Sequence, residues 1–191
     1  MNPERRPRHG GSRTKLTKTD DGRVRGFTLI ELLVVMGIIG VLATMSAVAV
    51  SRARQLAKTT KAQADVDSLS KAIAMLAGDT GKWPNGCPID EVSNPEVNLN
   101  SAQAGITVTP AVGDQRYGCF WSATDIARWN GPYMKDIVDP WGNAYLFDPD
   151  YQPRDACTPG TVAKQAAVVS FGPNEVGLNV YDCDDIYKIL R

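Results

Sequence analysis

The stretch FTLIELLVVMGIIGVLATMSAVAV, residues 27–50, decides how this chain is organised. It holds a single ionisable side chain, Glu31, and is otherwise apolar or uncharged. At ~1.5 Å per residue a helix of this length measures about 36 Å, more than the ~30 Å hydrocarbon core of a bilayer. A secretory signal peptide is the alternative, but its apolar region is typically only ~7–15 residues long. The stretch therefore predicts a membrane-spanning helix.

Glu31 is the informative residue of this helix. A carboxylate inside a membrane costs on the order of 2.5–3.5 kcal/mol and is normally kept only with a partner. The sequence offers no cation within one helical turn of it. A cut between Gly26 and Phe27 would create an α-amino group four residues away, and on a neighbouring helix that amine could pair with Glu31. A plain membrane anchor that carries one Glu is the alternative.

Residues 1–26 differ in composition from the rest of the chain. They hold eight of the 21 Lys and Arg residues but three of the 21 acidic residues, and no apolar run, so we expect disorder there. Without them the chain keeps 13 basic and 18 acidic residues, a net charge of −5. Nucleic-acid binding is therefore not expected of the remainder, although the basic segment alone would suit an RNA- or DNA-binding arm.

The segment GFTLIE at residues 26–31 follows basic residues and precedes the apolar stretch, and it resembles the processing site of type IV prepilins and pseudopilins. The resemblance implies that a prepilin peptidase cuts after Gly26 and methylates Phe27, and that Glu31 sets the registration of subunits. It also implies a cytoplasmic leader, a single pass through the bacterial inner membrane and a periplasmic C-terminal domain. The positive-inside rule alone leaves the orientation open, because four basic residues at 52–61 follow the stretch.

A helical pattern continues through residues 51–77 without Gly or Pro. Its small or apolar residues recur mostly at three- and four-residue steps, as in an amphipathic helix. They are Ala53, Leu56, Ala57, Ala64, Leu69, Ile73 and Leu76. We expect one helix over residues 27–77, with Gly78 as its C-cap.

The C-terminal part, residues 78–191, is expected to form a head domain. Turn formers dominate residues 82–117 and predict a long loop region. Short strands are expected at residues 144–147, 166–171 and 186–190. The expected class is α+β, a long helix packed on a small antiparallel sheet, as in pilins.

Four runs in this part carry a second resemblance: WNGPYMK at residues 129–135, DPWGNAY at 139–145, SFG at 170–172 and DDI at 184–186. They are similar to the major pseudopilin, the G-type subunit of type II secretion systems. The DPWGN run is expected to form a tight structural turn whose Trp fills the core.

The resemblance implies a structural subunit that polymerises through its N-terminal helix into a pseudopilus and drives protein export. The implied partners are further copies of the chain, minor pseudopilins or pilins, the prepilin peptidase, an inner-membrane assembly platform and membrane lipid. A type IV pilin of a surface pilus, for adhesion, motility or DNA uptake, is the nearest alternative. A membrane-tethered binding module or enzyme that never polymerises is the alternative from a different class.

In that family an acidic loop near the C-terminus binds calcium, and residues 174–185 are the matching stretch here. Oxygen ligands suit Ca²⁺. Asp184 and Asp185 are the first candidate ligands, followed by Asn174 and Asp182. The family pattern Ser-x-Gly-x-Asp-Gly becomes SFGPNE at residues 170–175, which lacks one carboxylate and the following glycine. A solvated acidic turn without metal is the alternative.

All four cysteines lie in the expected exported domain: Cys87, Cys119, Cys157 and Cys183. An even number in an oxidising compartment indicates two disulfides. Of the three pairings, we favour Cys87–Cys119 with Cys157–Cys183, because each closes a local loop. A zinc site is the alternative, but no CxxC spacing is present.

Catalysis is not expected. The single histidine, His9, lies in the leader, so a chain without the leader has no imidazole for a triad or a general base. The sequence contains no phosphate-binding glycine loop. Apart from calcium, we expect no cofactor.

Overall fold

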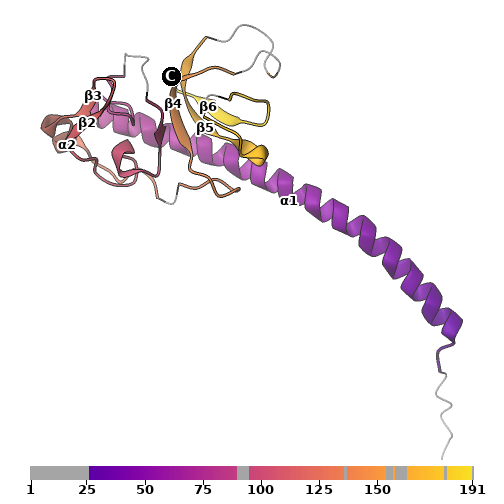
Figure 1. Ribbon diagram of the computed structural model, residues 1–191. Helices are drawn as coiled ribbons and strands as arrows, with labels where there is room; N and C mark the ends of the chain where they lie inside the picture. Colours follow the sequence, from indigo (N-terminus) through magenta and orange to yellow (C-terminus); the bar gives the residue numbers. More distant parts are fainter. Residues whose placement is uncertain are drawn as a thin grey trace, which may run out of the picture. The chain divides into compact units, whose positions relative to one another are not determined.

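The computed structural model describes residues 26–89, 95–135, 137–153, 157, 163–178 and 180–190 (Figure 1). The chain divides into two units, Met1–Ser46 and Ala47–Arg191. Apart from Gly26, the basic leader lies outside the described residues, so the expectation of disorder there stays a prediction.

The longest element is helix α1 (Leu29–Thr80), 52 residues long. It begins two residues later than predicted because Thr28 caps it. The backbone N–H of Thr28 donates to the Glu31 carboxylate at 2.8 Å, and the Glu31 N–H donates to Thr28 Oγ1 at 3.3 Å. This reciprocal pair is a capping box, which satisfies two backbone donors that the first turn leaves free.

The predicted end of the helix at residue 77 is wrong. Helix α1 continues through Gly78 to Thr80, and Gly81, with φ of 73°, donates its N–H to the carbonyl of Ala77 at 2.8 Å. The Thr80 hydroxyl donates to the Leu76 carbonyl at 2.7 Å and helps to hold the last turn. A glycine inside a helix costs about 1 kcal/mol relative to alanine, which the packed helix tolerates, so Gly78 does not end the helix.

Four antiparallel strands form the main sheet, in the order β1 (Val97–Asn98), β4 (Leu146–Tyr151), β5 (Gln165–Ser170) and β6 (Ile186–Ile189). Phe147 pairs with Val168, and Val169 pairs with Tyr187. Figure 1 shows β4, β5 and β6 beside the C-terminal half of α1. The α+β class and the three predicted strands are confirmed, with β4 beginning two residues later and running to Tyr151.

The predicted long loop is only partly correct. Within residues 82–117 the structure has β1, a 3₁₀ turn (Ala102–Ala104), and β2 (Gly113–Arg116), which pairs with β3 (Cys119–Trp121). A short helix, α2 (Ala123–Arg128), follows. Its signal was present in the sequence, because Ser122 and Asp125 form a capping box with bonds of 2.9 and 3.1 Å. The short strands carry no periodic pattern that sequence reasoning could detect.

The core lies between α1 and the sheet. The buried face of α1 consists of Ala62, Val66, Leu69, Ala72, Ile73 and Leu76, which recur at helical spacing. Phe147 and Val168 of the sheet and Trp121 pack in the same core. The predicted apolar face is therefore confirmed at Leu69, Ile73 and Leu76. The other predicted members are exposed: Ala53, Leu56, Ala57 and Ala64.

Two tyrosine hydroxyls connect the head to the helix. Tyr145 donates to Asp65 at 2.8 Å, and Tyr133 donates to Asp79 at 2.7 Å. Asp65 and Asp79 lie several turns apart on α1, so the two bonds hold the helix at two separate places.

Candidate functional site

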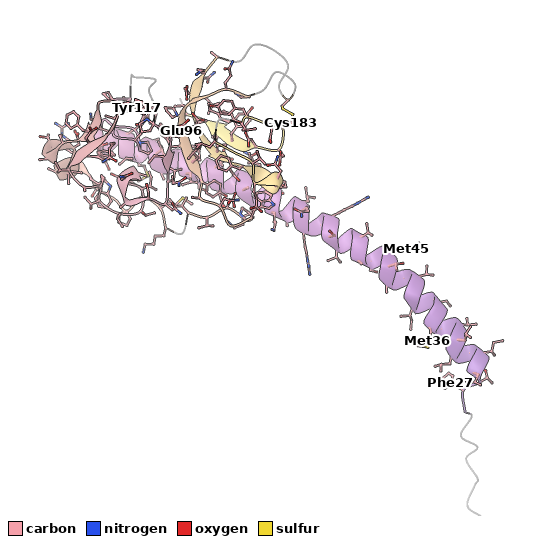
Figure 2. All side chains as sticks on the ribbon, in the orientation of Figure 1. Phe27, Met36, Met45, Glu96, Tyr117 and Cys183 are labelled. Atoms are coloured by element: carbon pink, nitrogen blue, oxygen red, sulfur yellow. A yellow bond between two sulfur atoms is a disulfide. The ribbon has the colours of Figure 1, made fainter. Side chains whose placement is uncertain are left out.

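The first unit presents an apolar helix surface. Every described residue from 26 to 46 is exposed, among them Phe27 at 88%, Leu29 at 87% and Leu33 at 72% (Figure 2). An 18-residue segment of helix α1 has a mean hydropathy of 2.5, and the helix is long and apolar enough to cross a membrane. An uncovered apolar surface of this size indicates contact with lipid or with other helices.

The predicted processing residues lie just outside this helix. Gly26 and Phe27 precede the first turn, have no regular secondary structure and are exposed. The peptide bond between them is therefore accessible in a segment that the helix does not protect. Their assignment as cleavage and methylation residues stays a prediction.

Glu31 has a partner that sequence reasoning missed. Its carboxylate accepts bonds from both the backbone N–H and the hydroxyl of Thr28, each at 2.8 Å. The signal was the spacing Thr-x-x-Glu, which is typical of a capping box. Because Glu31 is exposed, its carboxylate remains accessible to a cation on another molecule.

The DPWGN run forms the predicted tight turn. Asp139 Oδ1 accepts the backbone N–H groups of Trp141, Gly142 and Asn143 at 3.0, 2.9 and 2.8 Å. Its other oxygen accepts the Ser170 hydroxyl at 2.7 Å, which fixes the turn to the end of β5. The buried Asp139 carboxylate therefore organises this turn.

Trp141 is only partly buried in the core, so the prediction that it fills the core is correct in part. The ammonium of Lys58 lies 5.8 Å from the centre of its ring, within the range of a cation–π contact. The DPWGN turn thereby also contacts helix α1, at Lys58.

The acidic loop brings together three of the four predicted calcium ligands. The side-chain amide of Asn174 donates to Asp182 at 2.7 Å and to Asp184 at 2.6 Å, and the Asn174 backbone N–H donates to Asp184 at 3.0 Å. Gly172, with φ of 65°, allows the Asp184 carbonyl to approach closely, because a Cβ at this position would collide with it. The loop therefore holds two carboxylates around one amide.

Asp185 points elsewhere. The Tyr151 hydroxyl donates to its Oδ2 at 3.1 Å, while Oδ1 is buried and makes no hydrogen bond with the described residues. Burial raises the pKa of Asp185 to about 7. The structure therefore does not place Asp185 in the cluster formed by the other three residues.

The pKa values of Asp182 and Asp184 shift in opposite directions. Burial, followed by the hydrogen bond with Asp182, raises the pKa of Asp184. Burial also acts against ionisation of Asp182, but its hydrogen bonds with Asp184 and Asn174 lower the pKa of Asp182 overall. Two carboxylates that bond the same amide group favour a shared proton or a cation. Carboxylate oxygens suit a hard cation such as Ca²⁺, but the amide oxygen of Asn174 accepts the Val176 N–H at 2.7 Å, so Asn174 would become a ligand only with its side-chain amide turned over.

A second acidic cluster was not predicted. Carboxylate oxygens of Glu96, Asp148 and Asp150 lie within 4.8 Å of one another. Burial raises the pKa of Asp148 to about 7, and Lys164 pairs with Asp150 at 2.7 Å. Glu96 directly precedes β1, whereas the two aspartates belong to β4, which is far away in the sequence. No local sequence motif therefore predicts this cluster.

Both predicted disulfides are confirmed. Cys87 pairs with Cys119 with their Cα atoms 4.5 Å apart, and Cys157 pairs with Cys183 with their Cα atoms 5.1 Å apart. The first connects the segment after α1 to β3. The second connects to the acidic loop, directly between Asp182 and Asp184.

Comparisons with known proteins agree with this arrangement. Residues 22–47 match the family described as the prokaryotic N-terminal methylation motif. The chain is 30% identical over 126 residues to the type II secretion system core protein G of Pseudomonas aeruginosa. This match covers 64% of this chain and 71% of that protein. The proteins of the same name from Escherichia coli K12 and Aeromonas hydrophila are 30% and 28% identical, over 64% of this chain and 70% and 71% of their lengths.

No solved structure matches the chain. The curated relatives confirm the resemblance to the G-type subunit, since their matches are far longer than the methylation motif at residues 22–47. With an exposed apolar helix in one unit and the predicted sheet and turn in the other, this chain belongs to the family of type II secretion system core protein G, the major pseudopilins.

Proposed function

We propose that this chain is the filament subunit of a type II secretion pseudopilus. A prepilin peptidase cuts it after Gly26 and methylates Phe27, and the mature subunits polymerise through α1 to drive protein export. The observation that carries the proposal is the uncovered apolar surface of α1 within a prepilin methylation motif. Family membership favours this function over a surface pilus.

The subunit is anchored in a membrane by α1. In our proposal this is the bacterial inner membrane, crossed once, with the head in the periplasm. Two disulfides in the head support this orientation, because such bonds persist in oxidising compartments. The proposed partners are other copies of the chain, minor pseudopilins, the peptidase, the inner-membrane assembly platform and membrane lipid.

Assembly would transfer the exposed side chains of α1 from lipid to neighbouring helices. Both environments are apolar, so helix packing and specific polar contacts must supply the preference. Glu31 is the polar group suited to this role. Its exposed carboxylate would pair with the α-amino group of Phe27 on the next subunit, which exists only after cleavage. This dependence would prevent uncleaved precursors from joining the filament.

The proposed role is structural and not catalytic. Relatives carry the name of a secretion-system core protein, and the buried polar residues of the head serve its internal bonds, as Asp139 and Ser170 do. Force for export would come from adding subunits to the filament and from the platform that adds them.

The test is a charge-removing substitution at Glu31. In cells that carry the peptidase and the secretion machinery, Glu31→Ala should insert and lose its leader normally but form few or no filaments. Glu96→Ala removes a carboxylate from the head instead and should retain filaments. Filaments of normal abundance from Glu31→Ala would contradict the proposal.

We also propose that the acidic loop binds calcium through Asp182, Asp184 and Asn174, with Asp185 contributing only if its bond with Tyr151 opens. A bound Ca²⁺ would supply positive charge to a coupled pair of carboxylates and fix the loop that the second disulfide enters. Because the ion binds the folded state, it should raise thermal stability.

Calcium should raise the melting temperature of the full chain in detergent, while magnesium at equal concentration should raise it less. Asp184→Asn should remove the calcium-induced shift, and Asp150→Asn, in the second acidic cluster, should retain it. A shift lost in Asp150→Asn and kept in Asp184→Asn would place the ion at the other cluster and contradict the proposal.

A further inference from the structure

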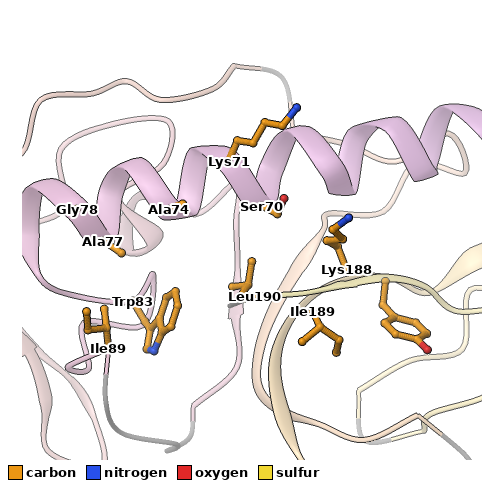
Figure 3. Close-up of a pocket in the computed structure, with 11 residues that line it drawn as sticks. Ser70, Lys71, Ala74, Ala77, Gly78, Trp83, Ile89, Lys188, Ile189 and Leu190 are labelled. Atoms are coloured by element: carbon orange, nitrogen blue, oxygen red, sulfur yellow. The ribbon is translucent and has the colours of Figure 1, made fainter.

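A groove of about 940 Å³ runs between α1 and the strand β6 (Figure 3). Ser70, Ala74, Ala77 and Gly78 form its helix wall, which is therefore smooth and shallow. Apolar side chains of Trp83, Ile89 and Leu190 line the rest, and β6 is the edge strand of its sheet.

The ionisable lining residues of the groove other than Tyr187 are basic. Lys71 is exposed at the rim on the helix, and Lys188 pairs with Asp67 at 2.7 Å. The groove is therefore apolar, with the ammonium of Lys71 at its rim and the charge of Lys188 balanced by Asp67. An apolar occupant flanked by an acidic residue would match it.

The same head carries a loop with the complementary character. Three apolar side chains close together in the sequence are exposed: Val176 at 47%, Leu178 at 58% and Val180 at 39%. Glu175 precedes them and is also exposed, and the carboxylates of Asp182 and Asp184 follow. We refer to residues 175–178 as the apolar loop.

The backbone of the apolar loop is held in an unusual conformation. Glu175 and Leu178 have φ angles of 58° and 46°, in the left-handed region that non-glycine residues rarely occupy. Gly177 lies so close to the ring of Phe171 that a Cβ there would collide with it. Strain of this kind is concentrated at functional sites. Here it directs apolar side chains into solvent.

The apolar loop and the groove are different surfaces of the head, because none of residues 175–178 lines the groove. A contact between the loop of one copy and the groove of another is therefore head-to-tail, and head-to-tail contacts continue into open filaments when they do not close into rings.

We propose that the groove binds the apolar loop of a second copy of this chain, with Val176 and Leu178 against Trp83 and Ile89 and with Glu175 beside Lys71. This contact between heads deepens the proposed filament function and rests on it. It gives the filament a lateral interface that is separate from the packing of α1.

A photo-crosslinking residue at position 178 tests the contact directly. In assembled filaments, irradiation should join position 178 of one subunit to the groove segment of another, around residues 74–89, as read by mass spectrometry of peptides. The same residue at position 108, where Val108 is similarly exposed at 48%, should not reach the groove. Crosslinks from position 178 to other surfaces would overturn the proposal.

Exchange of the two charges provides a second, independent test of the contact between heads. Lys71→Glu and Glu175→Lys should each lower the yield of filaments several-fold, and the double variant should restore it. Processed, inserted protein and the melting temperature are measured in parallel, to show that each variant folds. Equal loss in the single and double variants would overturn the contact.

The two proposals fail in different ways. If the unmodified chain forms no filaments that depend on Glu31, the filament function fails and the head contact fails with it. If it forms such filaments but the crosslinks and the charge exchange give the contrary results, only the head contact is wrong.

Discussion

The carboxylate of Glu31 accepts both the backbone N–H and the hydroxyl of Thr28, at 2.8 Å each. The same hydroxyl oxygen accepts the Glu31 N–H at 3.3 Å. This pair fixes the start of α1 at Leu29 and leaves Gly26 and Phe27 outside the helix. The residue expected to register subunits thus also caps the helix directly after the predicted processing site.

Thr28→Val keeps the shape of the side chain and removes its hydroxyl. Loss of an N-cap costs about 1 kcal/mol, so the amide of Glu31 should exchange with solvent roughly five-fold faster. Thr44→Val is the matched control, because the Thr44 hydroxyl bonds a carbonyl within the helix and caps nothing. Hydrogen exchange measured in detergent should separate the two variants, and equal protection in both would contradict the capping role.

Tyr145→Phe should destabilise the head, because the hydroxyl of Tyr145 bonds the Asp65 carboxylate and the ring is buried. Hydrogen bonds to charged groups contribute about 1.5–3 kcal/mol, and denaturant unfolding should show a loss of about that size. Tyr117→Phe, at a site 77% exposed, should change the stability little. If both substitutions have the same effect, the link between head and helix contributes nothing measurable.

Asp148 should make stability depend on pH. Burial raises its pKa in the folded protein to about 7, against an ordinary value of 3.8. The folded state therefore binds the proton more tightly than the unfolded state, so this contribution is complete below about pH 4 and is lost as the pH rises toward 7 and above.

Asp148→Asn should accordingly flatten the stability profile between pH 4 and 7 and should stabilise the protein at pH 8 by on the order of 1 kcal/mol. Glu175→Gln, on an exposed carboxylate, should leave the slope unchanged. The measurement is urea unfolding across this pH range. A steeper profile in Asp148→Asn would show that its carboxyl is ionised in the folded state.

Removing either disulfide should lower stability substantially. The bonds close loops with sequence separations of 32 and 26 residues, and loop-closure entropy predicts a loss of about 3–4 kcal/mol for each. Paired substitution of Cys87 and Cys119 by Ala should lower the unfolding midpoint, and so should paired substitution of Cys157 and Cys183. Reductant should lower the midpoint of the unmodified chain as well. An unchanged midpoint would mean that the thiols are not bonded in the native protein.

Patterns that extend over many residues made much of the fold predictable from the sequence. The apolar stretch, the helical spacing of Leu69, Ile73 and Leu76, and the three longer strands each extend over enough residues to be recognised. The disulfide pairing also followed, because local closure distinguished it from the two other pairings.

Features that depend on tertiary contacts were not predictable in the same way. The true end of α1 depends on the backbone angle of Gly81, which the sequence cannot distinguish from Gly78. Glu96 approaches Asp148 only because β1 pairs with β4. The bond between Tyr151 and Asp185 joins residues 34 apart, and it separates Asp185 from the cluster that sequence reasoning had assigned to it.

The most direct test of the central claim is the mass and N-terminal sequence of the full chain recovered from the membranes of cells that carry a prepilin peptidase. Our account predicts that the leader, Met1 to Gly26, is absent and that the chain begins at Phe27 with one added methyl group. A chain that retains its leader, or one that is cut near Ala47 at the end of the apolar stretch, would contradict processing as a pseudopilin.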